Sequence, residues 1–570
     1  MMKDRLHNVS SFKKKRRDCL ADIVMVNANI LTLDARNSRA RALAISGDRI
    51  MEVSTTRQVE RLITKNTKVI DAKGKTLTPG FIDTHTHPHA IYPFKSRMHV
   101  VDLSKAKSLQ AMTALMKDKA AITPSGEWVL GNNYRDTNFG RHPNRDDLDE
   151  ISTRHLIWIT HFTIHTSVVN SLVVRKARIG EETVDPEGGT LDRFWGHSKY
   201  PNGTPSGILF EKAQEFVLDR GVPALPAASK DEEKAGLRKC MREFMISNGV
   251  TSIGANADSR LMALLQDMRA EDGLPLRVNT MFQIGDDHVL LDSLRNIGLK
   301  SGLGDDRLRF GPLKLFAGNS RGARTCWLWD PYVGSHADDD PPYYGLPHPL
   351  LWPEPARLDD VILKGHEAGF QWAVHSVGDR EIDRLLDAFE KALRQCPRAD
   401  HRHRIEHSSI MGKNKRLLKR AKKLGVILNI LSTTYESGAG YGDYGPARIA
   451  YMAPYRSAID FGIRVSGHSD WPVSEAKPML RIYDMVNRKS KEGIVFGAKQ
   501  RITPEEAIRV WTMDGAYASF EERIKGSIEV GKLADVVMLT EDPTKVDPLT
   551  LKDIEVEMTV IGGNILYDRT

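Results

Sequence analysis

Short apolar segments bounded by turn residues recur along the middle of the chain, a pattern typical of buried parallel strands. Eight such segments are found, at residues 80–83, 250–254, 276–284, 311–316, 371–374, 404–406, 426–431 and 464–466. Helical periodicity separates most of them, and residues 381–394 place apolar side chains at Ile382, Leu385, Leu386, Phe389 and Leu393. This alternation predicts an α/β fold in which eight parallel strands form a TIM-like (β/α)8 barrel.

The two ends of the chain show a different pattern, in which short strands alternate with turns. Strand patterns occupy residues 23–26, 42–45 and 68–70 near the start, and residues 534–539 and 558–561 near the end. Neither end carries enough strands for a stable sheet of its own. We therefore expect residues 22–78 and 526–570 to form one small composite β-sandwich domain, and residues 79–525 to form the barrel.

The barrel pattern is interrupted twice. About 160 residues separate its first two strands, far more than one strand–helix unit needs, so a large subdomain is expected after the first strand, at about residues 97–235. A second excursion, at about residues 319–355, is rich in Trp, Tyr, Pro and Asp and is interpreted as a long active-site loop.

Composition narrows the class of protein. Of the 570 residues 41% are hydrophobic and 27% charged, which is typical of a soluble globular protein. No apolar run approaches the roughly 20 residues that a membrane span requires, so no membrane partner is expected. Part of the net charge of +8 comes from the basic run at residues 13–17. Because no aromatic residues interleave with it, residues 1–21 are expected to be a disordered tail, and no nucleic-acid partner is expected.

The cysteines and the first strand indicate the compartment. Four cysteines, at 19, 240, 326 and 396, have no paired spacing and give no disulfide framework. Asp22, Asn27 and Asn29 interrupt the apolar segment after the basic run, so it is not the core of a signal peptide. A cytoplasmic location is therefore expected.

Side chains that bind metals stand at the ends of five predicted strands. They are His85, His87, Lys314, His375, His407 and Asp470. In a (β/α)8 barrel the chemistry lies at the C-terminal ends of the strands. His85 and His87 are two residues apart and therefore face the same side of a strand. A buried core histidine is the alternative for His375 or His407 alone, but their place on consecutive strands after the His-x-His pair favours a metal site.

Lys314 and Asp470 need separate explanations. A cationic lysine beside a metal is repulsive, but burial lowers the pKa of a lysine, and its neutral amine can react with carbon dioxide. The resulting carbamate is an anion with two oxygens, suited to bridging two metal ions. An ordinary salt bridge is the alternative, disfavoured because Lys314 lies centrally in an apolar strand. Asp470 can bind one metal and accept the proton of the attacking water, as a general base; a surface or helix-capping aspartate is its alternative.

Six motifs together resemble one known group of enzymes. They are residues 79–87, 314–318, 375–380, 404–407, 469–473 and 526–535. At these motifs the chain resembles the amidohydrolase superfamily, and within it the YtcJ-like branch (amidohydrolase family 3), which includes N-substituted formamide deformylases. The resemblance extends from about Ile23 to Tyr567.

The resemblance implies a site with two divalent metal ions. His85, His87 and Asp470 would hold one ion, and His375 and His407 the other. Carboxylated Lys314 and a hydroxide would bridge them. Zinc is the expected metal, with manganese and iron as alternatives, and a homodimer is the expected assembly.

The resemblance also suggests substrate contacts. Within the inserted segment, His165 and Asn170 would face the site. His468 stands where this branch usually has glycine, and substrate contact is favoured over metal binding or packing. The run at residues 316–320 lacks the aspartate that is usual before the Gly-Ser of this loop, which leaves the anchoring of the loop open.

Aromatic residues are concentrated in the loop and at strand ends. They are Trp327, Trp329, Tyr332, Tyr343, Tyr344, Trp352, Trp372 and Trp471. They suggest an apolar or aromatic group beside the scissile bond, and Trp327 and Trp471 are the expected substrate contacts. The alternative is that they pack the loop onto the barrel.

The predicted function is metal-dependent hydrolysis of a carbon–nitrogen bond other than a peptide bond. A metal-bound hydroxide would attack a small-molecule amide, formamide, carbamate or cyclic amide, with Asp470 as general base. One alternative is a single-metal deaminase of a heterocycle, but such enzymes carry a glutamate where Gly378 stands here. The other is an inactive scaffold, which the retention of all six ligands opposes.

Overall fold

The computed structural model describes residues 20–88, 100–225, 228–285, 289–333, 342–437 and 442–569. The tail expected at residues 1–21 lies almost wholly outside these ranges, as does part of the loop expected at 319–355.

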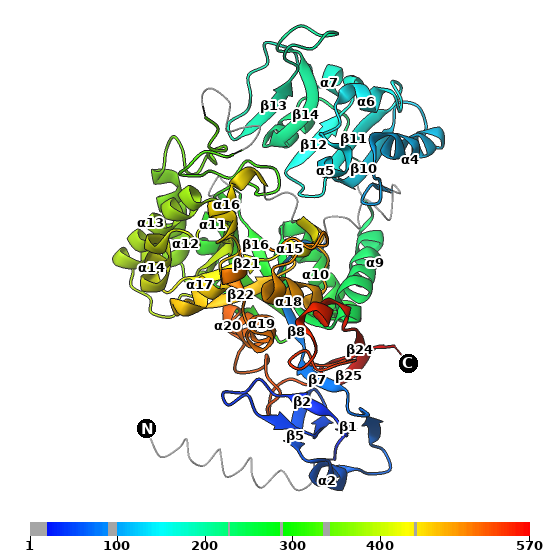
Figure 1. Ribbon diagram of the computed structural model, residues 1–570, viewed down its shortest axis with the longest axis vertical. Helices are drawn as coiled ribbons and strands as arrows, with labels where there is room; N and C mark the ends of the chain where they lie inside the picture. The colour runs from blue at the N-terminus through cyan, green and yellow to red at the C-terminus, as the bar shows by residue number, and fades with distance from the viewer. Residues whose placement is uncertain are drawn as a thin grey trace.

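The central unit is a barrel of eight parallel strands (Figure 1). They are β8 (Phe81–Thr86), β15 (Val250–Ala257), β16 (Arg277–Gln283), β18 (Leu308–Phe316), β19 (Trp372–Ser376), β20 (Arg404–His407), β21 (Ile427–Leu431) and β22 (Val465–His468). They are hydrogen-bonded in chain order. The last strand returns to the first, where Thr84 Oγ1 donates to the carbonyl of Gly467 (2.8 Å) and the amide of Asp470 donates to the carbonyl of His85 (3.1 Å). The eight expected segments coincide with these strands, so the predicted barrel is confirmed.

Helices surround the barrel because their apolar faces need the outer surface of the strands. They include α9 (Lys230–Cys240), α10 (Ser259–Glu271), α11 (Val289–Asn296), α12 (Ala356–Glu367), α13 (Asp379–Gln395), α14 (Lys415–Leu424), α17 (Tyr455–Asp460), α18 (Pro478–Asn487), α19 (Pro504–Val510) and α20 (Met513–Ala518). In α13 the expected apolar stripe is buried from Ile382 to Phe389, and Leu393 is half-buried. Its polar face pairs with α14, where Arg420 bonds Asp383 (2.5 Å) and Asp387 (2.6 Å).

Both ends of the chain build the β-structure below the barrel in Figure 1. One sheet contains β5 (Arg49–Ser54), β4 (Ala42–Ser46), β1 (Ile23–Val26) and β6 (Lys68–Asp71). The other contains β25 (Asn564–Asp568), β24 (Val556–Ile561), β23 (Val536–Leu539), β7 (Thr76–Pro79), β2 (Asn29–Leu31) and β3 (Arg39–Ala40). β7 and β23 pair antiparallel, which joins the two ends in one sheet. A buried ion pair, Arg277 Nε to Asp535 Oδ2 (2.6 Å), links this sheet to barrel strand β16.

The segment between β8 and β15 forms a separate layer at the opposite end of the molecule (Figure 1). Its mixed sheet runs β13 (Gly189–Arg193), β14 (Pro205–Glu211), β12 (Thr166–Val169), β11 (Leu156–His161), β10 (Trp128–Tyr134) and β9 (Val101–Asp102). Its helices are α4 (Leu109–Ala121), α5 (Asp136–Phe139), α6 (Arg145–Asp149), α7 (Ser171–Lys176) and α8 (Ala213–Leu218). Arg324 joins the layer to the barrel loops, because its guanidinium contacts Asp136 of the insertion (3.2 Å) and Asp443 of the barrel (2.9 Å). The expected fold class, with its composite β-domain and its insertion after the first strand, is confirmed.

Within the described ranges, none of the helices combines the length and the apolar composition that crossing a bilayer would require.

Three buried histidines lie behind strands β19 and β20. His366 Nε2 donates to the carbonyl of Cys396 (2.7 Å), so its Nδ1 accepts from His403 Nε2 (2.9 Å). His403 Nδ1 in turn accepts the amide of Trp372 (3.1 Å), and His401 Nδ1 accepts the amide of His403 (2.9 Å). Every ring therefore carries one proton and is neutral. Burial lowers the pKa of His401 to about 4 and that of His403 well below its usual value.

These neutral histidines predict a loss of stability in acid. The unfolded chain takes up protons below about pH 6.5, whereas the folded rings do not. The free energy of unfolding should therefore fall as the pH falls from about 6.5 toward 4, by up to about 1.4 kcal/mol per pH unit for each histidine. Thermal midpoints measured across this range for the wild type and for His401→Gln test it. The variant should show a shallower decline, and an unchanged pH slope would contradict the prediction.

Candidate metal centre

The His-x-His pair lies at the C-terminal end of β8. His85 Nε2 and His87 Nε2 are 3.3 Å apart, and they lie 3.5 and 3.3 Å from Asp470 Oδ1. The side chains are buried, His85 completely. The spacing of two residues on a strand has thus brought both imidazoles to one side, as the sequence predicted.

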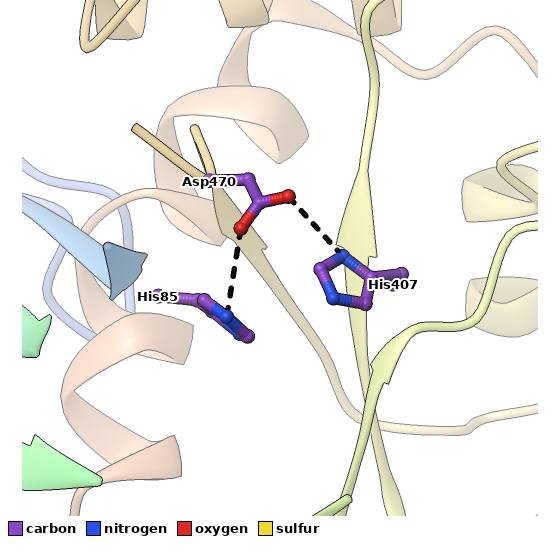
Figure 2. Close-up of side chains that lie close together, drawn as sticks. All are labelled: His85, His407 and Asp470. Carbon is purple, nitrogen blue, oxygen red and sulfur yellow. Dashed lines mark ion pairs between the residues drawn. The ribbon is translucent and has the colours of Figure 1, made fainter. Parts of the chain in front are cut away.

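His407 and Asp470 reach the same point from the other side of the barrel. His407 ends β20 and Asp470 follows β22, and both have a left-handed backbone, with φ of 69° and 57°. This conformation is uncommon for residues other than glycine and is concentrated at functional sites. Figure 2 shows the carboxylate of Asp470 between the imidazoles of His85 and His407, with His407 Nδ1 3.9 Å from Asp470 Oδ2. The ligand atoms of these three residues lie within 4.8 Å of one another.

His375, at the end of β19, extends the cluster. Its ring centroid is 4.5 Å from that of His407. Its Nε2 donates to the carbonyl of Asn319 (3.1 Å), which leaves Nδ1 as the nitrogen with a free lone pair. His375 can therefore offer Nδ1 to a metal beside His407.

Lys314 lies in the barrel interior among these histidines. It is fully buried, and its Nζ has no hydrogen-bond partner among the described residues. Burial lowers the pKa of Lys314 to about 8. The amine lies 4.6 Å from the centre of the Phe316 ring. A buried cation without a partner is unfavourable, so this position suits a lysine that is neutral or modified.

The donor atoms fit a divalent metal ion. Lys314 Nζ, Asp470 Oδ1 and both ring nitrogens of His468 are buried and lack hydrogen-bond partners in the part of the chain that the structure describes. Buried polar atoms are normally satisfied, so this group of unsatisfied atoms fits a metal ion as their partner. Imidazole nitrogens and carboxylate oxygens are the ligands that zinc accepts.

The charge states of the cluster also suit a metal. Burial lowers the pKa of His85 to about 3 and holds those of His375 and His407 well below their usual value, so these rings are neutral ligands. Burial opposes ionisation of Asp470, but the surrounding imidazoles of His407, His87 and His85 hold its pKa well below the usual range. The site thus presents lone pairs and one anion.

Glu406 is a functional residue that the sequence reasoning missed. It is fully buried and accepts from His85 Nδ1 (2.5 Å) and Asn429 Nδ2 (2.7 Å). Arg404 binds both its oxygens, at 2.8 and 2.9 Å. Because His85 Nδ1 donates to Glu406, its Nε2 lone pair is left facing His87 and Asp470. The available signal was the presence of an arginine and a glutamate, Arg404 and Glu406, in a four-residue strand expected to lie inside the barrel.

Two further contacts hold the ligands in place. Asp83 accepts from the amide (3.0 Å) and hydroxyl (2.5 Å) of Ser469, which ties β8 to the segment that carries Asp470. Asn256 Nδ2 lies 3.2 Å from His87 Nδ1.

A pocket of about 480 Å³ lies over the centre. From the barrel it is lined by His375, His407, Asp470, Leu431, Thr433 and Tyr435; from the insertion by Arg135, Asp136, Phe162, Thr163 and His165; and from the long loop by Arg321 and Arg324. His165 lies here as expected, with Nδ1 2.7 Å from Glu211 Oε2 and its ring 5.6 Å from that of His375. On the other side of His165, a second cavity of about 250 Å³ is lined by Lys314, Gln283 and Phe316.

Asn170 does not face the pocket, which corrects the expectation for it. It begins α7 as the N-cap, where Oδ1 accepts the amide of Val173 (3.3 Å) and also that of Ile157 (3.3 Å). Its Nδ2 donates to the carbonyls of Ser152 (3.1 Å) and His155 (3.0 Å). With all its hydrogen bonds made inside the insertion, Asn170 has a structural role.

Three other expected substrate contacts are also absent from the pocket lining. Trp471 belongs to a buried core cluster and packs on Phe244, with ring centroids 5.6 Å apart. The indole of Trp327 lies under the guanidinium of Arg380, 3.8 Å from its centre. His468 is buried beneath the pocket and stacks on His85, with centroids 4.9 Å apart. Packing, the alternative considered for the aromatic residues, is what the structure shows for both tryptophans.

The anchoring of the long loop, left open by the sequence, comes from Glu381. Its Oε1 accepts the amides of Asn319 (3.0 Å) and Trp327 (2.7 Å), and its Oε2 accepts those of Val377 (2.9 Å) and Gly378 (2.8 Å). The buried carboxylate therefore ties both ends of this part of the loop to the start of α13.

Comparisons with known proteins agree with this geometry. The chain is 27% identical to the N-substituted formamide deformylase of Arthrobacter pascens, over 97% of this chain and 99% of that protein. It is 26% identical to the putative amidohydrolase YtcJ of Bacillus subtilis (strain 168), over 90% of this chain and 92% of that protein. A metal-dependent hydrolase from Pyrococcus horikoshii OT3 shares the fold with a TM-score of 0.69 at 23% identity, covering 92% of this chain and 99% of that one.

A sequence profile described as the amidohydrolase family matches residues 68–567, which include both strands of the terminal sheet junction and all six expected ligands. The expected enzyme class, a metal-dependent hydrolase of carbon–nitrogen bonds, is confirmed at this level. The chain belongs to the amidohydrolase family.

Proposed function

We propose that the protein hydrolyses a small-molecule amide, formamide, carbamate or cyclic amide with two divalent metal ions. The observation that carries the proposal is the partnerless, buried amine of Lys314 beside a cluster of neutral histidines and one carboxylate. The similarity to an N-substituted formamide deformylase supports this substrate range.

The residues divide between two metal positions. His85 Nε2, His87 Nε2 and Asp470 Oδ1 form one donor set, because they approach one another within 3.5 Å. His375 and His407 would hold the second ion, and carboxylated Lys314 would supply an anionic ligand shared by the two positions. Zinc is the preferred ion, with manganese and iron as alternatives. When bound, the metals would lower the pKa of a water molecule and polarise the scissile carbonyl.

Lys314 is suited to carboxylation. With its pKa lowered to about 8, a substantial fraction of the amine is neutral near neutral pH. The Nζ lone pair forms a bond to the carbon of carbon dioxide and releases one proton, giving a carbamate anion. The cavity that Lys314 lines next to His165 gives a small molecule space beside it.

Asp470 is the proposed general base. Its Oδ1 is turned to His85 and His87, so we assign the proton of the attacking water to Oδ2. Asp470 then delivers this proton to the leaving nitrogen as the carbon–nitrogen bond breaks. His165, held by Glu211, is placed to hydrogen-bond the substrate from the insertion side.

The alternative of a single-metal deaminase lacks its proton shuttle. Gly378 stands where that chemistry needs a glutamate, and the nearby Glu381 already accepts four backbone amides. The cytoplasmic location and the homodimer stay predictions.

Substitution of the base should stop turnover without unfolding the chain. Asp470→Asn should reduce kcat on a formamide or amide substrate at least about a hundredfold, because the amide cannot accept the proton. Asp258→Asn, which alters a helix cap on another strand end, is the matched control and should keep activity. Activity of Asp470→Asn near the wild-type level would refute the mechanism.

Removal of the bridging lysine should change metal stoichiometry. Lys314→Ala should lower the metal content from two ions per chain to one or fewer, measured by elemental analysis, and abolish hydrolysis. A short carboxylate such as propionate should restore part of both, because it supplies the missing bridging anion. One metal per wild-type chain, with an unmodified Lys314 by mass analysis of the intact protein, would instead favour the deaminase.

Loss of the carboxylate behind His85 should weaken metal binding. Glu406→Gln removes the negative charge beside His85 and replaces one of the two acceptor oxygens by an NH2 group, so metal affinity should fall about 10- to 100-fold in chelator competition. Glu390→Gln, on the outer face of α13, is the control. Equal metal affinity in the two variants would show that Glu406 does not orient the ligand.

A further inference from the structure

The roof of the pocket carries a guanidinium that the proposed chemistry does not use. Arg135 follows β10 in the insertion and lines the same pocket as His375, His407 and Asp470. Its guanidinium stacks on the ring of Phe162, 4.0 Å from the centroid. Among the described residues, no carboxylate lies within 4.0 Å of its nitrogens, and these nitrogens donate no hydrogen bond. The side chain is half-buried, so water only partly compensates this charge.

The carboxylates nearest the insertion side are already engaged. Asp136 lies 3.1 Å from His161 Nε2 and 3.2 Å from Arg324 Nη2. Asp443 contacts the other guanidinium nitrogen of Arg324 at 2.9 Å. Arg324 and Asp136 therefore form a closed network that leaves Arg135 outside.

The carboxylates on the barrel side are engaged as well. Glu436 pairs with the fully buried Arg481 at 2.6 Å. Glu492 pairs with Lys491 at 3.8 Å. The charges of Glu436, the adjacent Asp136 and Glu475 act on Arg135, but none of these carboxylates forms an ion pair with it. Apart from Asp470, every carboxylate that lines the pocket thus has another cation as its partner.

A second guanidinium adds to the positive charge of this wall. Arg321, from the long loop, also lines the pocket, and its Nη2 donates to Thr433 Oγ1 (2.8 Å). The aromatic face under Arg135 restrains its plane and leaves the edges of the guanidinium for a planar anion.

We propose that the substrate carries a carboxylate that binds Arg135 while its amide lies on the metal centre. The inference rests on the proposed function, since that function places the amide. A half-buried guanidinium without an anion is unfavourable, and a bidentate carboxylate is its best geometric match. The substrate class is therefore an amide or formamide with an acidic group at the end away from the scissile bond, and Phe162 borders the intervening apolar part.

The test uses binding, so that it does not depend on turnover. Isothermal titration calorimetry of the zinc-loaded protein would compare linear dicarboxylates, from succinate to pimelate, with monocarboxylates of the same chain length. One carboxylate can occupy the metal centre and the other Arg135. At least one dicarboxylate should bind about tenfold or more tightly than the monocarboxylate of the same chain length. No advantage at any length would overturn the proposal.

Variants assign the effect to Arg135. Arg135→Met should reduce the dicarboxylate advantage to within twofold, and Arg135→Lys should keep only part of it, because a point charge lacks the planar fork. Lys491→Met removes the same charge from the pocket wall and should keep the advantage. An advantage that persists in Arg135→Met would overturn the proposal; if that variant does not fold, Arg135→Gln replaces it.

Hydrolysis of neutral N-alkyl formamides by the same preparation separates this proposal from the proposed function. Turnover without a dicarboxylate advantage would leave the hydrolase standing and remove the anion site. A dicarboxylate advantage without metal-dependent turnover of any amide would leave the anion site and remove the hydrolase.

Discussion

The buried ion pair between Arg404 and Glu406 is the constraint on which the site depends. Both side chains are buried in the barrel, where a charge can persist only with close partners. Glu406 is held by Nε and Nη2 of Arg404, by Asn429 and by His85. Arg404 also donates to the carbonyl of Thr84 (3.0 Å), on the strand that carries the His-x-His pair. Three strands of the barrel are thereby fixed relative to one another at the depth of the metal ligands.

This arrangement explains how the proposed ligands can be buried and still be held in fixed orientations. His85 cannot rotate without breaking its bond to Glu406, and Glu406 cannot shift without leaving the Arg404 charge unsatisfied. Removal of one partner from such a buried pair typically costs about 3–5 kcal/mol, so the geometry is protected by stability. The left-handed backbone at His407 and Asp470 then turns the remaining ligands toward the same point, and local strain there is offset by the surrounding core.

The sequence predicted the strands, because they follow from periodicity. It did not predict which way individual side chains point, because that depends on local backbone geometry. Eight apolar segments predicted the barrel, and strand-end positions indicated the six expected ligands, because both follow from regular alternation. Trp471 was misassigned because it follows Asp470, whose left-handed φ changes the direction of the chain. Asn170 was misassigned because a polar residue before a helix can either cap it or face a ligand, and only the four hydrogen bonds of its amide decide between them. Glu406 was missed because it contacts His85 and not the proposed metal position, and in the sequence it stands only as the residue before His407.

The division of labour follows from where each group originates. The barrel supplies the neutral histidines, the lysine and the carboxylate that are proposed to bind the metal ions and activate water. The insertion supplies Arg135, Phe162 and His165, and it is held over the barrel by Arg324 through Asp136 and Asp443. Because Arg324 comes from the long barrel loop, the roof and the floor of the pocket are coupled by one side chain. The pocket over the proposed metal ligands is therefore shaped jointly by the insertion, the long loop and the barrel strand ends, whereas the proposed ligands themselves all come from the barrel.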